Sequence, residues 1–386
     1  MRENVGLIFA ACETCLLHDV AMNDLKNKFR ACLLGGAAGD ALGYAVEFDS
    51  WSRIRSQYGD RGITSFVAHD FAPLGGISDD TQMTLFTAEG LLRAYTRFMG
   101  KGITTVKGVT EYAYLRWLHT QGRQIPDAHL DGWLITHRDL FARRAPGNTC
   151  LTALDHLSSQ RFNDGPEPPR NDSKGCGTVM RLAPVALMGV AHEWSLPHAA
   201  QVAVDLAEIT HHHRTSSVAS AAMVIMIMRL LQGASKRQAR DDMLAFAATL
   251  DGSYEFLQCF LQLQPALDAG DDTPRIIDEM LGHGGWVAED ALLIAVYAFL
   301  KADDFDEILR IAVNHSGDAD STGAIAGNLA GAFYGLDAID ANKWVRDLEL
   351  GDVIDEMAVD LFESPEWESS EPWDVPEDLW RKYPGH

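Results

Sequence analysis

Residues 314–332 read N-H-S-G-D-A-D-S-T-G-A-I-A-G-N-L-A-G-A. The first half is polar and acidic, and Ser321 and Thr322 are favourable N-cap residues, so we expect a loop that leads into a helix. In the second half a glycine recurs at every fourth position, which places the glycines on one helix face. Each glycine costs a helix about 1 kcal/mol relative to alanine. We therefore expect a buried helix that a neighbouring segment approaches closely.

Two aspartates, Asp318 and Asp320, lie one residue apart where this predicted helix begins. A turn into a helix can bring their carboxylates together, and two carboxylates about 4 Å apart repel by about 4 kcal/mol at an effective dielectric of about 20. A divalent cation removes this repulsion, and Mg²⁺, Mn²⁺ and Ca²⁺ all favour carboxylate ligands. A single motif of this kind more commonly consists of one aspartate that caps the helix and a second that is exposed to solvent, without a metal ion.

A second stretch, L-G-G-I-S-D-D-T-Q-M at residues 74–83, has the same organisation. Glycines, a hydroxyl and paired acids precede apolar residues at helical spacing. Each stretch alone offers few oxygen ligands for a divalent ion. Together they offer Ser78, Asp79, Asp80, Asp318, Asp320 and Ser321. The two stretches therefore predict a shared metal site that could hold two ions.

Composition and net charge limit the kinds of partner that the protein can bind. The chain has 386 residues, of which 47% are hydrophobic and 23% charged, as in ordinary globular proteins. This length allows two or three domains or one large helical domain. The net charge of −23, with no cluster of Lys and Arg to offset it, opposes binding to nucleic acid and to anionic membranes. Phosphates on a ligand would have to be neutralised by metal ions and backbone N–H groups.

The cysteines and the apolar runs indicate the cellular compartment in which we expect the protein. Six cysteines are scattered over the chain, which favours reduced thiols in the cytoplasm over a disulfide framework. No apolar run reaches the roughly 20 residues that a membrane span needs. The apolar residues 5–11 are bracketed by acids and preceded only by Arg2, so we expect no signal peptide.

Helical periodicity organises most of the chain. From Asp24, apolar residues at helical spacing lead into a glycine-containing segment that ends near Gly43, with Asp40 and Glu47 near its end. Further helical patterns cover 80–98, 104–120, 131–143, 149–157, 216–231, 237–249, 253–261, 274–281 and 289–301, and another surrounds Trp344. Residues 48–74, 160–174 and the chain after residue 364 predict loops and irregular structure. Since no series of strands is visible, we predict an all-α fold, a single large orthogonal helical bundle over residues 24–386 with an N-terminal extension at 1–23.

Three further segments could contact a ligand. Gly175, Cys176, Gly177 and Thr178 precede a predicted helix, and their free N–H groups could form a phosphate cradle, although such a loop alone is weak evidence. Trp286 follows a glycine-rich turn, where a core anchor is commoner than a base-stacking platform. The histidines at 211–213 cannot all face one site, so solvated or capping roles are the default expectation.

Six segments together resemble the ADP-ribosylglycohydrolases related to the dinitrogenase reductase-activating enzyme. They are G-D-A-L-G-Y-A-V-E (39–47), S-D-D-T (78–81), G-C-G-T-V-M-R-L-A-P (175–184), T-H-H-H (210–213), G-W-V-A-E (285–289) and G-D-A-D-S-T-G (317–323), in the order of that family. The resemblance implies an all-helical domain with a binuclear Mg²⁺ or Mn²⁺ centre at the bottom of a cleft. It also implies hydrolysis of the N-glycosidic bond between ADP-ribose and a modified protein. Serine at both hydroxyl positions is more similar to the arginine-specific branch.

The resemblance assigns roles residue by residue. The implied metal ligands are Ser78, Asp79, Asp80, Asp318, Asp320 and Ser321. The implied catalytic residues are Glu47, Asp79, Asp80 and Asp320, with Glu47 at an acidic position that some members use near the metals as a gate or in catalysis. The implied substrate-binding residues are Gly175, Cys176, Gly177, Thr178 and Trp286. Cys176 stands where many members carry Asn, so the polar contacts of that loop differ here.

Alternative functions remain open at this point. Residues 1–23 have no counterpart in the common core, and one class of bacterial immunity proteins with this fold plugs an ADP-ribosyltransferase toxin with such an extension. The expected partner is an ADP-ribosylated protein or, in this alternative, such a toxin. Serine-linked, nucleobase-linked or free ADP-ribose are alternative substrates. A non-catalytic scaffold is disfavoured, because it gains nothing from clustered buried acids.

Overall fold

The computed structural model describes residues 3–126, 129–163, 170–367 and 374–385. Its helices are α1 (Glu3–Tyr44), α2 (Trp51–Tyr58), α3 (Asp79–Lys101), α4 (Val106–Thr120), α5 (Asn148–Asn163), α6 (Ala183–Ala191), α7 (Leu196–Ala207), α8 (Arg214–Leu231), α9 (Lys236–Ala247), α10 (Tyr254–Phe260), α11 (Leu263–Asp268), α12 (Thr273–Met280), α13 (Ala288–Lys301), α14 (Phe305–Val313), α15 (Ala319–Tyr334), α16 (Ala341–Trp344), α17 (Gly351–Glu363) and α18 (Glu377–Lys382). Short 3₁₀ helices lie at Leu134–Thr136, Arg138–Phe141, Val179–Arg181, Leu336–Ala338 and Ser364–Glu366. These described segments contain no strand, so the all-α prediction is confirmed.

Two glycine rows join the central helices α1 and α15. A Cβ added at Gly327 would lie 2.0 Å from the carbonyl oxygen of Gly35, and one added at Gly331 would lie 1.9 Å from that of Ala31. The two backbones are therefore in direct contact, as the glycine spacing predicts. Asn328 Nδ2 also donates to the Cys32 carbonyl over 2.7 Å, a buried hydrogen bond across the crossing.

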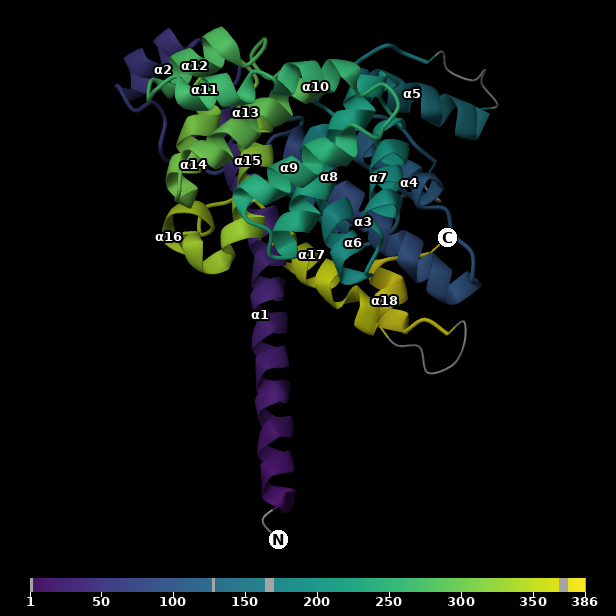
Figure 1. Ribbon diagram of the computed structural model, residues 1–386. Coiled ribbons are helices and arrows are strands. Elements are labelled where there is room, and N and C mark those ends of the chain that lie inside the picture. The colour runs from purple at the N-terminus through teal and green to yellow at the C-terminus, as the bar shows by residue number, and fades with distance from the viewer. Residues whose placement is uncertain (1–2, 127–128, 164–169, 368–373, 386) are drawn as a thin grey trace.

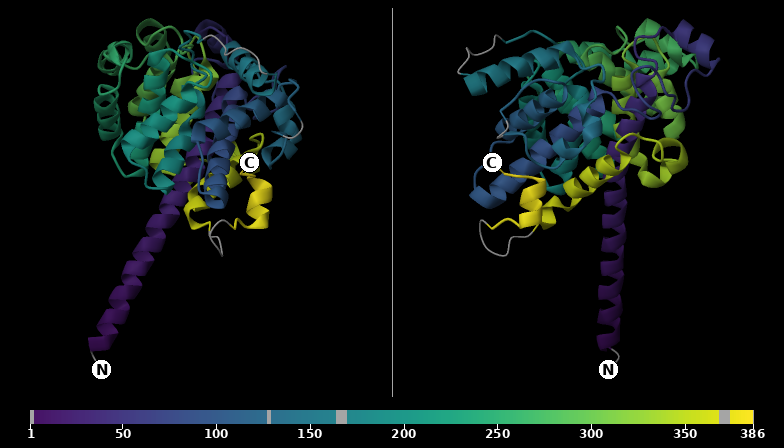
Figure 2. Two further views of the ribbon diagram at one scale, coloured as in Figure 1. Left: turned by 90° about the vertical axis from the view of Figure 1, so that its right-hand side faces the viewer. Right: turned by 180° about the vertical axis from the view of Figure 1, so that it is seen from behind.

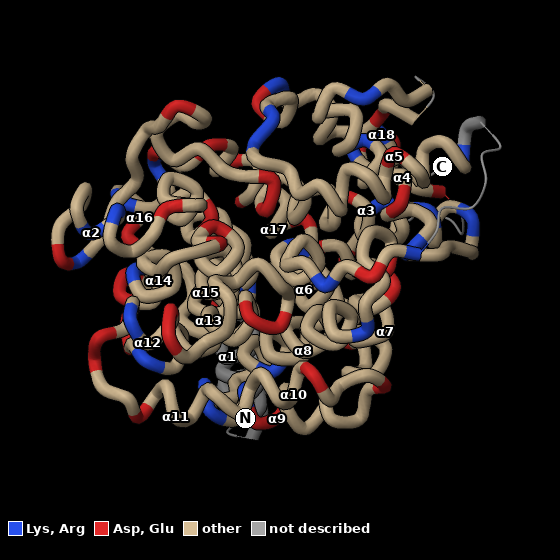
Figure 3. The backbone as a smooth tube through the Cα atoms, turned by 90° about the horizontal axis from the view of Figure 1, so that it is seen from above, with Lys and Arg blue, Asp and Glu red and all other residues tan. Residues whose placement is uncertain are grey.

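The other helices surround this pair. Seen from above, α13 and α15 lie inside the array, while α2, α7, α10 and α11 lie at its periphery (Figure 3). Among the described residues one helix, α8, is long and apolar enough to cross a membrane by length and composition, but 89% of that span is buried inside the protein. This is the burial of a core helix, as the small apolar residues at 216–231 predict.

The N-terminal extension continues α1 without a break in the helix. Figures 1 and 2 show this part of α1 running away from the other helices. The division of the chain at residue 23 and the single domain from residue 24 stay predictions.

Several predicted elements differ in the structure. The α15 helix begins at Ala319, with Asp318 and not Ser321 or Thr322 as its N-cap, because the Asp318 side chain accepts a hydrogen bond from the Ser321 N–H. Residues 131–143 form two short 3₁₀ helices, since Gly132 has a φ of +91° and the Trp133 N–H donates to Lys382.

Other differences concern helices that are absent from the prediction. The region 48–74 contains α2, in which only Ile54 is buried, so its periodicity is weak. The prediction also lacks α14 and α17, although buried apolar residues recur at helical spacing in both, and the tail after residue 364 contains α18. In the loop predicted at 160–174, residues up to 163 belong to α5, and residues 164–169 lie outside the described part.

Candidate metal and substrate site

A cleft of about 1180 Å³ opens where the end of α1 meets the starts of α3 and α15. It is lined by most of the predicted site residues, namely Glu47, Asp79, Asp80, Gly175, Cys176, Gly177, Trp286, Asp318, Asp320 and Ser321. Ser78 and Thr178 are fully buried and do not line it. The structure therefore brings both acidic stretches into one place, as the sequence predicts.

Glu47 reaches this place because of the glycine at the end of α1. A Cβ on Gly43 would lie 2.1 Å from the Ala319 carbonyl oxygen, so this end of α1 is in backbone contact with the start of α15. The next turn is fixed by a 2.9 Å hydrogen bond from the Glu47 N–H to the Gly43 carbonyl. Glu47 is thereby held against the acids of α15.

The start of α3 is fixed by Asp40, which lies fully buried on α1. Its carboxylate accepts hydrogen bonds from the backbone N–H groups of Ser78 and Thr81 at 3.1 Å, and a further one from the Thr81 hydroxyl. Burial and then the charge of Asp320 raise the pKa of Asp40 to about 7, although these hydrogen bonds oppose the shift. Sequence reasoning placed Asp40 near this end of α1 but gave it no role.

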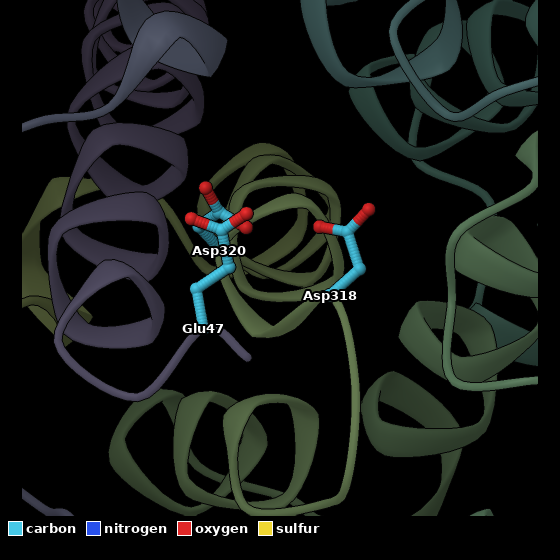
Figure 4. A group of neighbouring side chains, drawn as sticks. All are labelled: Glu47, Asp318 and Asp320. Atoms are coloured by element: carbon cyan, nitrogen blue, oxygen red, sulfur yellow. The ribbon is translucent and has the colours of Figure 1, made fainter. Parts of the chain in front are cut away.

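Three carboxylates meet at the floor of the cleft. One oxygen each of Glu47, Asp318 and Asp320 lies within 4.8 Å of the others. Figure 4 shows the Glu47 and Asp320 carboxylates close together, with the Asp318 carboxylate across from them. The Ser321 N–H donates to Asp320 over 3.0 Å, and Asp318 caps the same turn. Both aspartates are thus oriented by the first turn of α15.

The two acids of α3 lie in the same cleft but outside this close group of three. Asp79 accepts a 3.3 Å hydrogen bond from the Gly147 N–H, while its own N–H donates to the Arg144 carbonyl. The Ser78 hydroxyl accepts a hydrogen bond from the Asp80 N–H over 3.1 Å, which caps the start of α3.

Burial and mutual repulsion disfavour the ionised forms of the cleft acids. Burial, followed by neighbouring carboxylates, raises the pKa of Glu47 to about 11 and the pKa values of Asp79, Asp80 and Asp318 well above their ordinary value. Glu47 Oε2 and Asp80 Oδ2 are buried and have no hydrogen-bond partner. In the part of the chain that the structure describes, none of these carboxylates forms an ion pair with a basic residue. Such an oxygen-rich, uncompensated cluster fits hard divalent cations such as Mg²⁺ and Mn²⁺.

The predicted phosphate loop packs beside these acids. The Cys176 N–H donates to the Trp286 carbonyl over 3.2 Å, and the Ala288 N–H donates to the Lys174 carbonyl over 2.8 Å, so the two segments are paired. Cys176 Sγ lies 2.7 Å from Asp318 Oδ2, which connects the loop to the acid cluster. Thr178 lies behind the loop with its hydroxyl buried. Trp286 is 41% exposed, so it is not the core anchor that its sequence context favours.

His211 also lines the cleft, although the sequence favours solvated or capping roles for the histidines at 211–213. The ring is 2% exposed, and a Cβ added at Gly175 would lie 3.2 Å from its Nε2 atom. Its Nδ1 atom hydrogen-bonds with the Thr210 hydroxyl over 2.9 Å. Burial and the neighbouring Arg181 lower the pKa of His211 to about 3, so the ring is neutral. His213, by contrast, caps α8 as expected. The T-H-H-H motif indicates that a histidine lies near the site, but the sequence does not determine which of the three faces it.

Comparisons with known proteins show what this chain is similar to. A family model described as ADP-ribosylglycohydrolase matches residues 21–370. An ADP-ribosyl-[dinitrogen reductase] glycohydrolase of Rhodospirillum rubrum is 27% identical over 318 residues, which cover 82% of this chain and 88% of that protein. An ADP-ribosylarginine hydrolase Tri1 of Pseudomonas putida is 27% identical over 346 residues, which cover 87% of this chain and 78% of that protein. A solved structure described as an ADP-ribosylglycohydrolase-related protein complex has a TM-score of 0.59 at 26% identity, and the match covers 88% of this chain and 99% of that one.

Proposed function

The chain belongs to the ADP-ribosylglycohydrolase family, and we propose that it is a metal-dependent hydrolase that removes ADP-ribose from arginine side chains of modified proteins. The resemblance predicted from the six motifs is confirmed at the level of the family. The arginine linkage is supported by relatives named as ADP-ribosylarginine hydrolases and by serine at positions 78 and 321.

The uncompensated acid cluster carries the proposal. Asp79, Asp80, Asp318 and Asp320 would supply the charge to hold two Mg²⁺ or Mn²⁺ ions, and Ser78 and Ser321 would add hydroxyl oxygens. When bound, such ions supply a coordinated water of lowered pKa and orient ribose hydroxyls. Cleavage at an anomeric carbon develops positive, oxocarbenium-like charge, which the carboxylates around the cleft floor stabilise.

Glu47 has a separate role in this proposal. Its carboxyl group lies in the cleft within 4.8 Å of Asp318 and Asp320, where it can carry a proton. From there it can donate to the guanidino nitrogen that leaves the anomeric carbon and recover the proton from the attacking water. The neutral His211 ring lies beside Gly175 and Gly177, where it supports the loop that would receive the phosphates.

The experiment is release of ADP-ribose from an arginine-modified protein, with and without Mg²⁺ or Mn²⁺. Asp80→Ala and Asp320→Ala should each lower metal-dependent release at least about 100-fold, since each removes a charge that would retain the ions. Asp70→Asn, a change in an acid on the cleft wall outside the cluster, is the matched control and should leave release unchanged. Metal-independent release would contradict the metal site. No release from a folded parent protein would contradict the arginine linkage.

A further inference from the structure

Two aromatic side chains meet at the mouth of the cleft while still exposed to water. Phe48 is 68% exposed and Trp286 is 41% exposed. Their rings stack with centroids 5.4 Å apart and an interplanar angle of 21°, and both residues line the cleft. Burial in a hydrophobic core accounts for neither side chain. Exposed aromatic groups beside a cleft are typical of surfaces that contact a ligand.

The backbone at Phe48 also requires an explanation. Its φ is +70°, in the left-handed region, where the Cβ of any side chain crowds the neighbouring carbonyl group. The turn is fixed on both sides, because the Glu47 N–H donates to Gly43 and the Asp49 N–H donates to Val46. Glycine would adopt this conformation without strain. A phenylalanine that is strained and exposed at once is not explained by stability, and such positions are concentrated at functional sites.

Both rings are adjacent to the acid cluster. Phe48 follows Glu47, whose carboxylate belongs to the cluster. The Trp286 carbonyl accepts a hydrogen bond from Cys176, whose sulfur touches Asp318. In the proposed reaction the anomeric carbon lies at this cluster. The acceptor arginine, still attached to its protein, must therefore extend outward through the mouth, past the two rings.

We propose that Phe48 and Trp286 form a platform that binds the guanidino group of the modified arginine, an inference that rests on the proposed function. A guanidinium ion is planar and cationic, and it stacks on aromatic faces. The 5.4 Å separation of the rings leaves no space for a third plane between them, so the guanidino group packs on an outer face of the pair. A hydroxyl-linked acceptor such as serine has neither the plane nor the charge. The platform thus selects the acceptor and not the ADP-ribose.

The test compares two readouts in the full-length protein. The first is kcat/KM for release of ADP-ribose from an arginine-modified peptide, and the second is the Kd of free ADP-ribose from calorimetry. Phe48→Gly and Trp286→Ala should each lower kcat/KM about tenfold, the expected effect of losing a partly exposed cation–π contact. Both should leave the Kd of free ADP-ribose unchanged, and Trp286→Phe should keep most of the activity.

Folding and general surface effects are controlled within the same set. Phe48→Gly should be at least as heat-stable as the parent, because glycine relieves the left-handed strain. Tyr254→Ala removes an aromatic side chain that is 76% exposed but does not line the cleft, and it should change neither readout.

Each other outcome overturns the inference in a distinguishable way. Unchanged kcat/KM in Phe48→Gly and Trp286→Ala, beside an active parent, would refute the platform and leave the proposed function standing. An equal loss of ADP-ribose affinity would assign the rings to the nucleotide. A parent that binds ADP-ribose but releases none from the arginine-modified peptide would refute the proposed function and the platform with it.

Discussion

Replacing Gly327 with alanine should force the two central helices apart. The new Cβ would lie 2.0 Å from the Gly35 carbonyl oxygen and 2.5 Å from its carbon, whereas ordinary contact begins at 3.4 Å. The obstructing atoms are backbone and cannot rotate away, so α1 and α15 must separate by roughly 1 Å in a close-packed interior. Overpacking of this kind costs about 3 kcal/mol at the upper end of its usual range. Alanine regains about 1 kcal/mol of helix propensity, which leaves a net loss of about 2 kcal/mol.

The assay is urea unfolding followed by far-UV circular dichroism, with Gly108→Ala as the matched control. Gly108 also lies within a helix, α4, but an added Cβ would meet only the side chain of Thr105, which can rotate away. That variant should gain up to about 1 kcal/mol. The same substitution is thus expected to change stability in opposite directions at the two positions.

The separation should also disturb the cleft. Asp318 and Asp320 belong to the first turn of α15, and Glu47 follows α1, so moving the helices apart widens the acid cluster. Gly327→Ala should therefore also weaken Mg²⁺-induced stabilisation. If Gly327→Ala were as stable as the parent while Gly108→Ala showed its gain, the direct backbone contact of α1 with α15 would be refuted.

Two further predictions concern charge and the N-terminal extension. The raised pKa values of Asp40 (about 7) and Glu47 (about 11) mean that the folded, metal-free protein keeps protons that the unfolded chain releases. Stability without metal should therefore fall as the pH rises from about 5 to about 8, and Mg²⁺ should raise Tm most at the higher pH; a Tm that rises with pH would contradict this sign. Deleting residues 1–23 should leave metal-dependent ADP-ribose release intact, because every acid of the cleft lies beyond them; loss of release from a folded truncated protein would tie the extension to catalysis.

The sequence predicts the helix crossing and the meeting of the two acidic stretches because each carries a free-energy cost that is visible in the local sequence. Glycines that weaken a helix must be offset by close packing, and paired acids at two helix starts need a shared countercharge. The spacing of Gly323, Gly327 and Gly331 therefore indicates a backbone contact before any partner is known. The structure adds the partner, a matching row on α1 that includes Gly35 and Gly39.

What the residue pattern could not predict depends on docking between distant segments. Glu47 joins the acids only because Gly43 lets the end of α1 touch Ala319, and nothing in the local residue pattern distinguishes it from a surface acid. The choice of Asp318 over Ser321 as the N-cap of α15 depends on the loop before it, where the Asp318 N–H donates to Gly284. His211 faces the cleft and His213 does not, because Thr210, held by Arg181, hydrogen-bonds with the His211 ring.

The contact between α1 and α15 through their glycines also determines the geometry of the acid cluster. Carboxylates that repel one another would normally relax apart and weaken any cation site, because binding would then have to draw them together again. Here Gly39 and Gly43 hold the end of α1 against the backbone of α15, and Asp40 fixes the start of α3 from the same turns of α1. The acids therefore stay close together at a cost in stability, which cations offset when they enter. Pre-organisation of this kind removes the free-energy cost of bringing the ligands together when an ion binds. A mutation in the helix crossing, remote from any ligand atom, should therefore weaken the affinity of the cleft for divalent ions.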